Sequence, residues 1–440
     1  MADLSAYEQL LLELVNRARL DPLAEAARLG IDLNQGLAAG TLNGTAKQVL
    51  AGNSLLNDSA TGHSDWMLAT DTFSHTGAGG SSPGDRMAAA GYSFTGSWTW
   101  GENIAWVGTT GTVNQLTSTI DINDNLFLSP GHRENMLGAN FREMGAGIST
   151  GPFTYLGTTY NSEMATENFA KTGTSLFVTG VTYNDLDHDR FYDVGEAIAG
   201  RTVTVKSGST VIGTDVSEPA GGYGVAVDAG ALRVHFSGGG LTGVVTAVVT
   251  VGTENAKVDL VGTDSILASA TTTLGGNAKE LHLLGVAAIN GAGNNLDNII
   301  EGNSGANRLV GFDGNDTLTG GGGRDFLTGG IGADTFDFNV AAHSFGASRD
   351  RILDFNGADD TIDLSGVDAN TLVANDQVFD WRGTAAFTGV AGQVRYVIQD
   401  NVNPALDFTF VYADSNGDRV ADFNLEIAGL HTLAQDDFLL

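Results

Sequence analysis

Apolar residues near the start of the chain recur with the period of an amphipathic helix. The recurring positions are Tyr7, Leu10, Leu11, Leu14, Val15 and Ala18. Ser5 and Glu8 have the spacing of a capping box, and we expect the helix to stop at Asp21 and Pro22. Similar patterns predict helices over 57–70, 85–90 and 130–137, and strands over 143–149 and 163–169. Helices mixed with strands in this way predict one α+β domain over residues 1–172.

After Ser175 the pattern changes to an alternation of apolar and polar residues. The alternating apolar positions include Leu176, Val178, Val181, Tyr183, Val203, Val205, Tyr223, Val225, Val227, Leu232 and Val234. Further strand-like segments follow at 244–251 and 256–261. Short alternating strands with glycine-rich turns between them predict an all-β sandwich over residues 175–263.

Residues 293–337 repeat one nine-residue pattern five times without a gap. The copies read GNNLDNIIE, GNSGANRLV, GFDGNDTLT, GGGGRDFLT and GGIGADTFD. Their sixth residues are Asn298, Asn307, Asp316, Asp325 and Asp334, and their eighth residues are Ile300, Leu309, Leu318, Leu327 and Phe336. Glycines permit tight turns, and the apolar eighth residue supplies one core position per strand. A flexible linker would not keep these positions in register, so the repeat predicts an ordered structure.

The repeat matches G-G-x-G-x-D-x-U-x, which is typical of a calcium-binding parallel β-roll. We therefore predict a β-roll over residues 276–337, with 279–289 as its leading coil. A calcium ion takes about 6–8 oxygen ligands, which adjacent turns can share. The residues predicted to bind Ca²⁺ here are Asp313, Asp316, Gly323, Asp325, Gly332 and Asp334. The first two copies carry Asn in place of Asp, so we expect them to be structural, with weak or absent metal.

A second candidate calcium site lies between the first two strands of the predicted sandwich. Segment 185–196 reads DLDHDRFYDVGE and has the ligand spacing of an EF-hand loop. Its predicted ligands are Asp185, Asp187, Asp189, Phe191, Asp193 and Glu196. Arg190 stands where an EF-hand has glycine, and strands rather than helices flank the loop, so a solvated acidic turn is the alternative. Part of the same spacing recurs at 414–425, where Leu425 occupies the last position and a plain turn is predicted.

Composition narrows the possible functions. The chain has 440 residues, with 21 Lys and Arg against 52 Asp and Glu, a net charge of −31. Such a charge excludes binding to nucleic acid or an anionic membrane through a general basic surface. The absence of cysteine excludes disulfides, thiolate metal sites and cysteine nucleophiles. No run of 18 apolar residues predicts a transmembrane helix, and the N-terminus lacks the pattern of a cleaved secretion signal.

Seven phrases in the first domain carry a family resemblance. They are LVNRAR (14–19), HSDWM (63–67), FSHT (73–76), DRMAAAGY (85–92), GENIA (101–105), SPGHRENML (129–137) and MGAG (144–147). In this order they resemble the bacterial branch of the CAP superfamily, the cysteine-rich secretory, antigen 5 and pathogenesis-related 1 proteins. The resemblance implies an α-β-α sandwich whose central cleft holds two histidines and two acidic residues, with a divalent metal in some members.

Matched to the family motifs, the cleft residues of this chain are His75, Glu102 and His132. The fourth acid is not evident, because Ser129 falls near its place; Asp124 and Glu134 are candidates. Two histidines and a glutamate suffice for an open zinc site that could activate water. Three interpretations of the cleft stay open. It could bind a lipid, another small apolar ligand or a surface partner. It could be the site of a metal-dependent hydrolase or peptidase, or it could be a structural cluster without activity.

The rest of the chain carries two further resemblances. Segment 185–196 and the phrase AGGYGVAV resemble the calcium-binding B-type repeat domains of bacterial adhesins. The phrases ADTFDF (333–338), SRDRILDFNGADDTIDLSGV (348–367) and DSNGDRVADFNLEI (414–427) resemble the C-terminal export domain of serralysin-type metalloproteases, here over 338–440. That resemblance implies passage through a type I secretion machinery to the exterior, without a cleaved N-terminal signal. No H-E-x-x-H motif is present, so serralysin-type zinc catalysis is not expected. The oligomeric state is left open.

Overall fold

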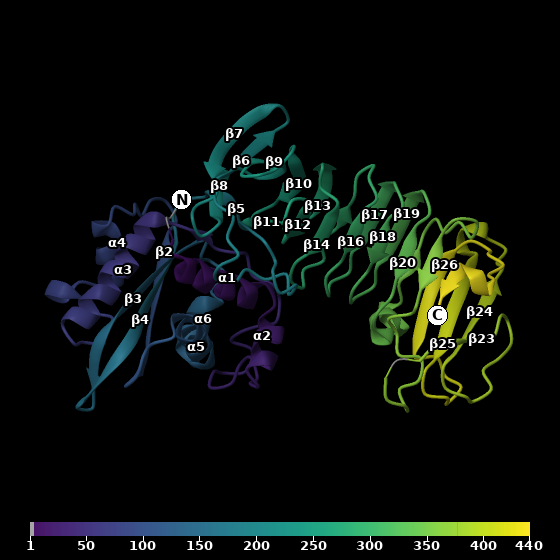
Figure 1. The fold of residues 1–440 in the computed structure, drawn as a ribbon, viewed down its shortest axis with the longest axis horizontal. Helices are drawn as coiled ribbons and strands as arrows, with labels where there is room; N and C mark the ends of the chain where they lie inside the picture. Colours follow the sequence, from purple (N-terminus) through teal and green to yellow (C-terminus); the bar gives the residue numbers. More distant parts are fainter. Residues whose placement is uncertain (1–3, 376) are drawn as a thin grey trace. The chain divides into compact units, whose positions relative to one another are not determined.

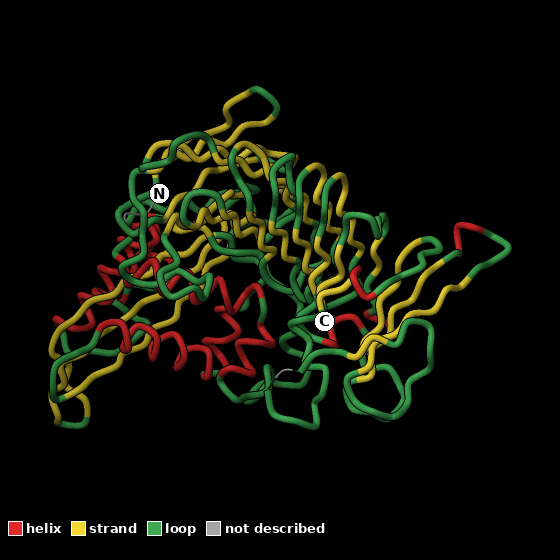
Figure 2. Tube along the Cα trace, turned by 45° about the vertical axis from the view of Figure 1, so that its right-hand side comes forward, coloured by secondary structure: helices red, strands yellow, loops and turns green. Residues whose placement is uncertain are grey.

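The computed structural model describes residues 4–375 and 377–440. The chain divides into two compact units, residues 1–263 and 264–440, which are coloured purple to teal and green to yellow in Figure 1. All α-helices of the described residues lie in the first unit, and the second unit consists of strands, loops and short 3-10 helices. Figure 2 draws the α-helices and the 3-10 helices alike in red. The chain therefore combines an N-terminal α/β domain with a large β-rich region.

The N-terminal domain has three layers. Its helices are α1 Ala6–Leu20, α2 Pro22–Arg28, α3 Ser54–Ala69, α4 Pro83–Ala89, α5 Gln115–Leu128 and α6 Pro130–Met136. Its strands are β1 Ala51–Gly52, β2 Thr99–Thr109, β3 Glu143–Tyr155 and β4 Thr158–Lys171, and they form one sheet in the order β1-β3-β4-β2. Helix α3 packs on one face of the sheet, whereas α1, α5 and α6 enclose the main core on the other.

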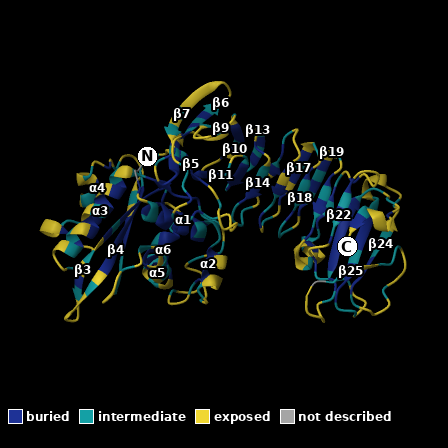
Figure 3. Cartoon of the chain, viewed as in Figure 1, coloured by how far each residue is buried: buried dark blue, intermediate teal, exposed yellow. Residues whose placement is uncertain are grey.

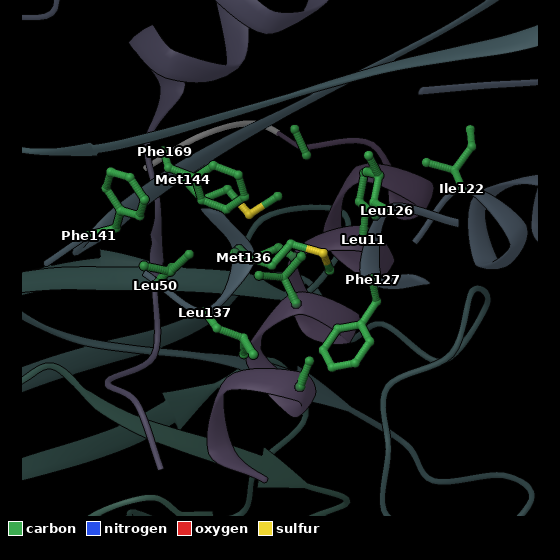
Figure 4. Close-up of a cluster of buried hydrophobic side chains, with 14 of the residues drawn as sticks. Leu11, Leu50, Ile122, Leu126, Phe127, Met136, Leu137, Phe141, Met144 and Phe169 are labelled. Carbon is green, nitrogen blue, oxygen red and sulfur yellow. The ribbon is translucent and has the colours of Figure 1, made fainter. Parts of the chain in front are cut away.

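The main core of this domain is drawn in Figure 4. It joins residues of α1, α5, α6, β3 and β4, among them Leu11, Val15, Phe127, Met136, Met144 and Phe169. The buried guanidinium of Arg19, from the phrase LVNRAR, ties the helices to the loops around them. It donates to the carbonyl oxygens of Gln48 at 2.7 Å and Met136 at 2.6 Å. Motif residues of this kind stabilise the fold and lie away from the surface.

Helix α1 begins with the predicted capping box, in which Ser5 and Glu8 each accept a backbone N–H. Four elements were not predicted, namely the short helix α2, the two-residue strand β1, helix α5 and the long strand β2 that contains GENIA. Ser129 is the N-cap residue of α6, but its side chain makes no capping hydrogen bond. Helix α6 begins with Pro130, which needs no backbone donor at that position.

A module of seven strands completes the first unit. The strands are β5 Leu176–Tyr183, β6 Arg201–Ser207, β7 Thr210–Val216, β8 Gly222–Val227, β9 Gly230–Gly238, β10 Val245–Val251 and β11 Ala256–Val261. Strands β7-β6-β9-β10 are antiparallel neighbours. Strand β5 pairs with β8 antiparallel and with β11 parallel.

This module buries the polar side of helix α1 (Figure 3). Gln9 and Glu13 are 3% and 4% exposed. The Glu13 carboxylate lies 3.0 Å from the ammonium of Lys257 on β11, which also contacts Asp259. Helix α1 is thus buried on two sides, against its own domain and against the following strands.

The second unit is built mainly from parallel strands. They are β12 Ser265–Ala268, β13 Thr272–Gly276, β14 Glu280–Leu283, β15 Gly291–Ala292, β16 Ile299–Glu301, β17 Arg308–Asp313, β18 Thr317–Thr319, β19 Phe326–Ile331, β20 Thr335–Asp337, β21 Arg351–Ile352, β22 Thr361–Asp363, β23 Asp380–Trp381, β24 Gln393–Gln399, β25 Phe408–Asp414, β26 Phe423–Ala428 and β27 Phe438–Leu439. Each nine-residue copy supplies one strand, and successive copies alternate between two sheets.

Pairing between neighbouring strands of one sheet therefore joins residues that are 18 positions apart in the sequence. Ile300 pairs with Leu318 and Leu318 with Phe336 in one sheet, while Leu309 pairs with Leu327 in the other. All five of these eighth-position residues are fully buried. The repeat thus stacks one apolar side chain per strand into a continuous core between the two sheets.

Candidate functional site

The three cleft residues predicted from the sequence come together in the N-terminal domain. The His75 Nδ1 atom lies 2.9 Å from Glu102 Oε1, and the rings of His75 and His132 have centroids 6.5 Å apart. The His75 side chain is 51% exposed, whereas that of Glu102 is 1% exposed. A buried carboxylate therefore orients a half-exposed imidazole.

Arg86, from the phrase DRMAAAGY, completes this cluster and was missed in the sequence. Its guanidinium bonds to Glu102 Oε2 and donates to the carbonyl oxygens of His75 and Ser81, both at 3.0 Å. Both oxygens of Glu102 are thus engaged, one by His75 and one by Arg86. Glu102 positions His75 in the way that a carboxylate supports a metal-binding or catalytic histidine from behind.

His132 lies beside this pair with a different environment. Burial lowers the pKa of His132, and the charge of His75 lowers it further. Its Nδ1 atom is buried without a hydrogen-bond partner. Behind it, Asn103 donates to the His132 carbonyl oxygen at 3.2 Å and to Glu167 at 2.9 Å. Burial also raises the pKa of Glu167 to about 7, so a buried acid that the sequence did not reveal lies behind His132, joined to it through Asn103.

Neither candidate for a fourth cleft acid has a hydrogen bond or ion pair to His75 or His132 among the described residues. The carboxylate of Asp124 is bound by Arg28, with Nη1 at 3.0 Å from Oδ2, and Glu134 is exposed on α6. His63, from HSDWM, is buried and bonds through Nε2 to the carbonyl oxygen of Ser74 at 2.9 Å, and burial lowers its pKa. His63 thus fixes the segment that carries His75.

In the second unit, the sixth residues of the repeat form two ladders. The backbone N–H of Asn298 donates to Asp316 at 2.8 Å, and that of Asp316 donates to Asp334 at 2.9 Å. In the other ladder, Asn307 donates to Asp325 at 2.7 Å. Each carboxylate thus receives one N–H from the turn 18 residues earlier.

The Asp and Asn members of the ladders differ in one respect. Asp316, Asp325 and Asp334 are at most 1% exposed, and the Oδ2 atom of each has no hydrogen-bond partner. In contrast, the side-chain amides of Asn298 and Asn307 donate to the carbonyl oxygens of Lys279 and Ile289. Buried polar atoms are almost always paired, so the three orphaned oxygens mark positions that require a further partner.

The same three carboxyl groups have strongly shifted pKa values. Burial raises the pKa of Asp316 and of Asp325 to about 7, and that of Asp334 to about 6. Neighbouring carboxylates add to the rise, for example that of Asp334 next to Asp316. A bound cation would offset the free-energy cost of burying the ionised carboxylates and would reduce the repulsion between them.

The ladders continue past the last recognisable repeat. Asp325 donates its N–H to Asp350 at 2.8 Å, and Asp334 donates to Asp360 at 3.0 Å. Burial and the charge of Asp325 raise the pKa of Asp350 to about 8. Asp350 and Asp360 were missed because their segments lack the nine-residue spacing, although both belong to the phrase SRDRILDFNGADDTIDLSGV.

The remaining residues predicted for the repeat sites lie in the turns around the ladders. Asp313 is exposed at the end of β17. Gly323 and Gly332 have positive φ angles of 98° and 151°. A Cβ atom on Gly332 would lie 1.8 Å from the carbonyl oxygen of Gly314, so only glycine fits this approach of two turns.

The loop at 185–196 brings its acidic residues together. The carboxylates of Asp185, Asp187 and Asp189 have oxygens within 4.8 Å of one another. Glu196 folds back and accepts the N–H groups of Leu186 at 2.7 Å and Asp193 at 3.0 Å. Burial raises the pKa of Asp193, and the charges of Asp189 and Asp187 raise it further.

Two other features distinguish this loop. Arg190, where an EF-hand has glycine, adopts a φ of 61° and donates its N–H to Asp185 at 3.1 Å. The ring of Phe191 lies 5.0 Å from the guanidinium of Arg17 on helix α1. The loop is thus held against the N-terminal domain.

Two family comparisons match separate parts of the chain. Residues 12–166 match the family described as CAP, the cysteine-rich secretory protein family. The N-terminal domain is a CAP domain. Residues 231–440 match the family described as the peptidase M10 serralysin C terminal. That match begins inside the predicted sandwich, well before residue 338.

No helix of the described residues is long and apolar enough to cross a membrane. The two domain matches together fit a secreted protein.

Solved structures resemble parts of the chain. An extracellular protein with an SCP domain from Bacillus anthracis str. Ames is 26% identical over 29% of this chain, which spans 35% of that protein, with a TM-score of 0.22. A subunit of the mannuronan C5-epimerase from Azotobacter vinelandii is 30% identical over 37% of this chain and 77% of its own, with a TM-score of 0.25. An outer surface protein from Borrelia burgdorferi is 18% identical over 28% of this chain and 78% of its own, with a TM-score of 0.21. These TM-scores are too low to carry an argument, and no curated protein matches the chain.

Proposed function

We propose that this chain is a secreted CAP-domain protein whose second unit binds calcium and folds as a β-roll once the ion is available. The single observation that carries the proposal is the set of buried, unpartnered Oδ2 atoms on Asp316, Asp325 and Asp334. The ladder positions that hold Asn have satisfied side chains and serve as an internal comparison. Only the Asp positions leave an oxygen without a partner.

Calcium fits this donor set better than a transition metal does. The donors are carboxylate and backbone carbonyl oxygens, which suit a hard cation, and the turns contain neither cysteine nor histidine. When bound, calcium would neutralise the carboxylates that burial otherwise drives towards protonation. The serralysin-type match supports the further proposal that a type I machinery exports the chain before calcium is encountered. The loop at 185–196 is proposed as an additional calcium site, with the ligands predicted above.

The ladder proposal predicts distinct effects for two matched substitutions. Asp325→Asn should remove at least one calcium ion from the calorimetric stoichiometry of the full-length chain, because an amide replaces an ionised ligand. Asp363→Asn, on strand β22, should leave the stoichiometry unchanged, since Asp363 pairs with Asp337 outside the ladders. Equal stoichiometry in wild type and Asp325→Asn would contradict the ladder assignment.

For the cleft of the CAP domain we propose ligand binding rather than zinc-dependent hydrolysis. A catalytic zinc needs three protein ligands, and both oxygens of Glu102 are already engaged by His75 and Arg86. Only two imidazoles are left to bind a metal. The exposed side chains of Phe73 and Trp100 support the proposal of a small apolar ligand, and Trp100 lies on the same face of β2 as Glu102.

The zinc content of the protein tests this choice. After incubation with zinc and gel filtration, we expect the wild type and the His75→Ala/His132→Ala variant to retain equally little zinc by elemental analysis. The acidic loops could hold some zinc, and the double variant controls for this contribution. Stoichiometric zinc that is present in the wild type and lost in the variant would support a metal-dependent hydrolase instead.

A further inference from the structure

Basic residues are scarce in the second unit, yet half of them gather on one face. After Thr263 the chain has eight basic residues, namely Lys279, Arg308, Arg324, Arg349, Arg351, Arg382, Arg395 and Arg419. Four of these, Arg308, Arg324, Arg349 and Arg351, lie on or next to three neighbouring parallel strands, β17, β19 and β21. Figure 1 labels the first two of these strands. We refer to these four residues as the arginine row.

Strand register places the row on the outer face of the sheet. Arg308 pairs with Phe326, Phe326 pairs with Arg351, and Arg351 pairs with Glu426. The next residue on each of the first three strands, Leu309, Leu327 and Ile352, is fully buried. Because side chains alternate along a strand, Arg308 and Arg351 point away from that core. Arg324 and Arg349 precede their strands, and their contacts with Glu426 place them on the same face. Neighbouring strands are about 4.8 Å apart, so the row extends across the sheet rather than gathering at one point.

A single carboxylate faces the arginine row. Glu426 is 3% exposed, and its oxygens lie 3.0 Å from Arg351, 3.3 Å from Arg324 and 3.6 Å from Arg349. Arg308 has no carboxylate partner among residues 4–375 and 377–440. Four guanidinium charges against one carboxylate leave a surplus of three positive charges in a chain of net charge −31. One arginine would suffice to neutralise Glu426.

Aromatic rings hold the guanidinium groups in place. Arg351 lies 4.6 Å from the ring of Phe408 and 5.8 Å from that of Phe326, and Arg324 lies 5.5 Å from Phe326. Arg349 lies 5.1 Å from the ring of Phe410. The Nε atoms of Arg349 and Arg351 are buried and have no hydrogen-bond acceptor. The row therefore presents ordered cations, which reduces the entropy cost of binding an anion.

We propose that the arginine row binds the carboxylate groups of an extended acidic polysaccharide. The planar fork of arginine matches carboxylates, and Glu426 already accepts one hydrogen bond from Arg324 and one from Arg351. The spread of cations across several strands suits a ligand with charges at repeated intervals better than one small anion. The half-buried rings of Phe326 and Phe408 offer apolar surface to sugar rings between those charges. A nucleic acid has a far denser charge, which the net charge of the protein opposes.

Binding of a short oligogalacturonate to the calcium-loaded full-length chain tests this proposal by calorimetry. We expect measurable binding that weakens with added salt, and no binding of the methyl-esterified oligomer, which has the same sugars without the charges. Arg308→Gln and Arg324→Gln should each weaken binding about tenfold, because each removes a charge-assisted hydrogen bond. Arg382→Gln serves as a matched control, since Arg382 pairs with Asp380 at 3.6 Å outside the row.

Arg308→Gln also separates binding from folding, because no ion pair of the described residues depends on Arg308. Far-ultraviolet circular dichroism of each variant in calcium should match that of the wild type. The proposal would be overturned by equal affinity in Arg308→Gln, Arg324→Gln and wild type, or by equal binding of the esterified oligomer. Equally tight binding of single-stranded DNA, or binding of citrate but not of the oligomer, would also overturn it.

Discussion

Removal of calcium from the full-length chain is expected to unfold the second unit while the CAP domain stays folded. Without the ion, the buried carboxylates of Asp316, Asp325 and Asp334 must either ionise without a partner or take up protons. Each calcium site would contribute about 2.7 kcal/mol of stability when the ion is at a hundredfold excess over its Kd. Three such sites would together contribute about 8 kcal/mol, which is comparable to the whole stability of a typical domain, about 5–15 kcal/mol.

Tryptophan positions allow the two units to be followed separately. Trp381 lies in the second unit, whereas Trp66, Trp98, Trp100 and Trp106 lie in the CAP domain. A chelator should therefore remove the part of the β-sheet circular dichroism that comes from the second unit, while the signal of the first unit remains. It should also change the fluorescence of Trp381, which is obtained as the difference between the wild type and Trp381→Phe. Identical circular dichroism in chelator and in millimolar calcium would refute the proposal.

The pH dependence in chelator follows from the direction of the pKa shifts. The folded-state pKa of Asp316 and Asp325 is raised to about 7, far above the value near 3.9 of an unfolded chain. Their contribution to stability is therefore complete below about pH 4 and is lost as the pH rises through 7. The calcium-free unit should be more stable at pH 5 than at pH 8, and the opposite order would contradict the buried ladders.

Gly147→Ala is expected to destabilise the CAP domain by at least about 3 kcal/mol. A Cβ atom at this position on β3 would lie 2.0 Å from the backbone nitrogen of Thr61 in helix α3, and backbone atoms cannot move aside as a side chain can. Gly145 makes a similar approach, 2.1 Å from the carbonyl carbon of Leu56. These two glycines of the MGAG phrase let the helix lie directly on the sheet.

Gly62→Ala is the matched control for this prediction. It lies on the same helix α3, where an added Cβ meets no atom within 4 Å. It should stabilise the domain by roughly 0.5–1 kcal/mol, because alanine has the higher helix propensity. Urea unfolding followed by tryptophan fluorescence in calcium measures both variants. A Gly147→Ala domain as stable as the wild type would show that the helix can move away from the sheet at little cost.

Local patterns were informative wherever structure depends on residues close in sequence. The capping box at Ser5 and Glu8 is a contact between residues three positions apart, and the structure contains it. The nine-residue repeat predicted the buried eighth residues, since a fixed period places Leu318 and Phe336 in the same environment. Helix α5 was missed because its segment, QLTSTIDINDNLFL, is rich in β-branched residues and Asn, which have low helix propensity.

Features that depend on contacts between distant segments could not be predicted from the sequence. The apolar period of helix α1 identified one buried face, but the burial of Glu13 depends on Lys257, which no local pattern connects with it. Similarly, motif matching proposed His75, Glu102 and His132 as one cluster, but it could not show that Arg86 occupies the second oxygen of Glu102. That contact changes the expected chemistry of the cleft.

The sequence by itself determined the order of the domains, the repeat and the residue types of the candidate calcium sites, because these depend on composition and local periodicity. Only the tertiary structure decided which carboxylate oxygens lack partners, how Glu102 is held, and that four arginines share one sheet face. Each of these depends on strand register or on packing between segments far apart in the chain. A linear pattern specifies which side chains are present, whereas their partners are fixed only when the chain folds.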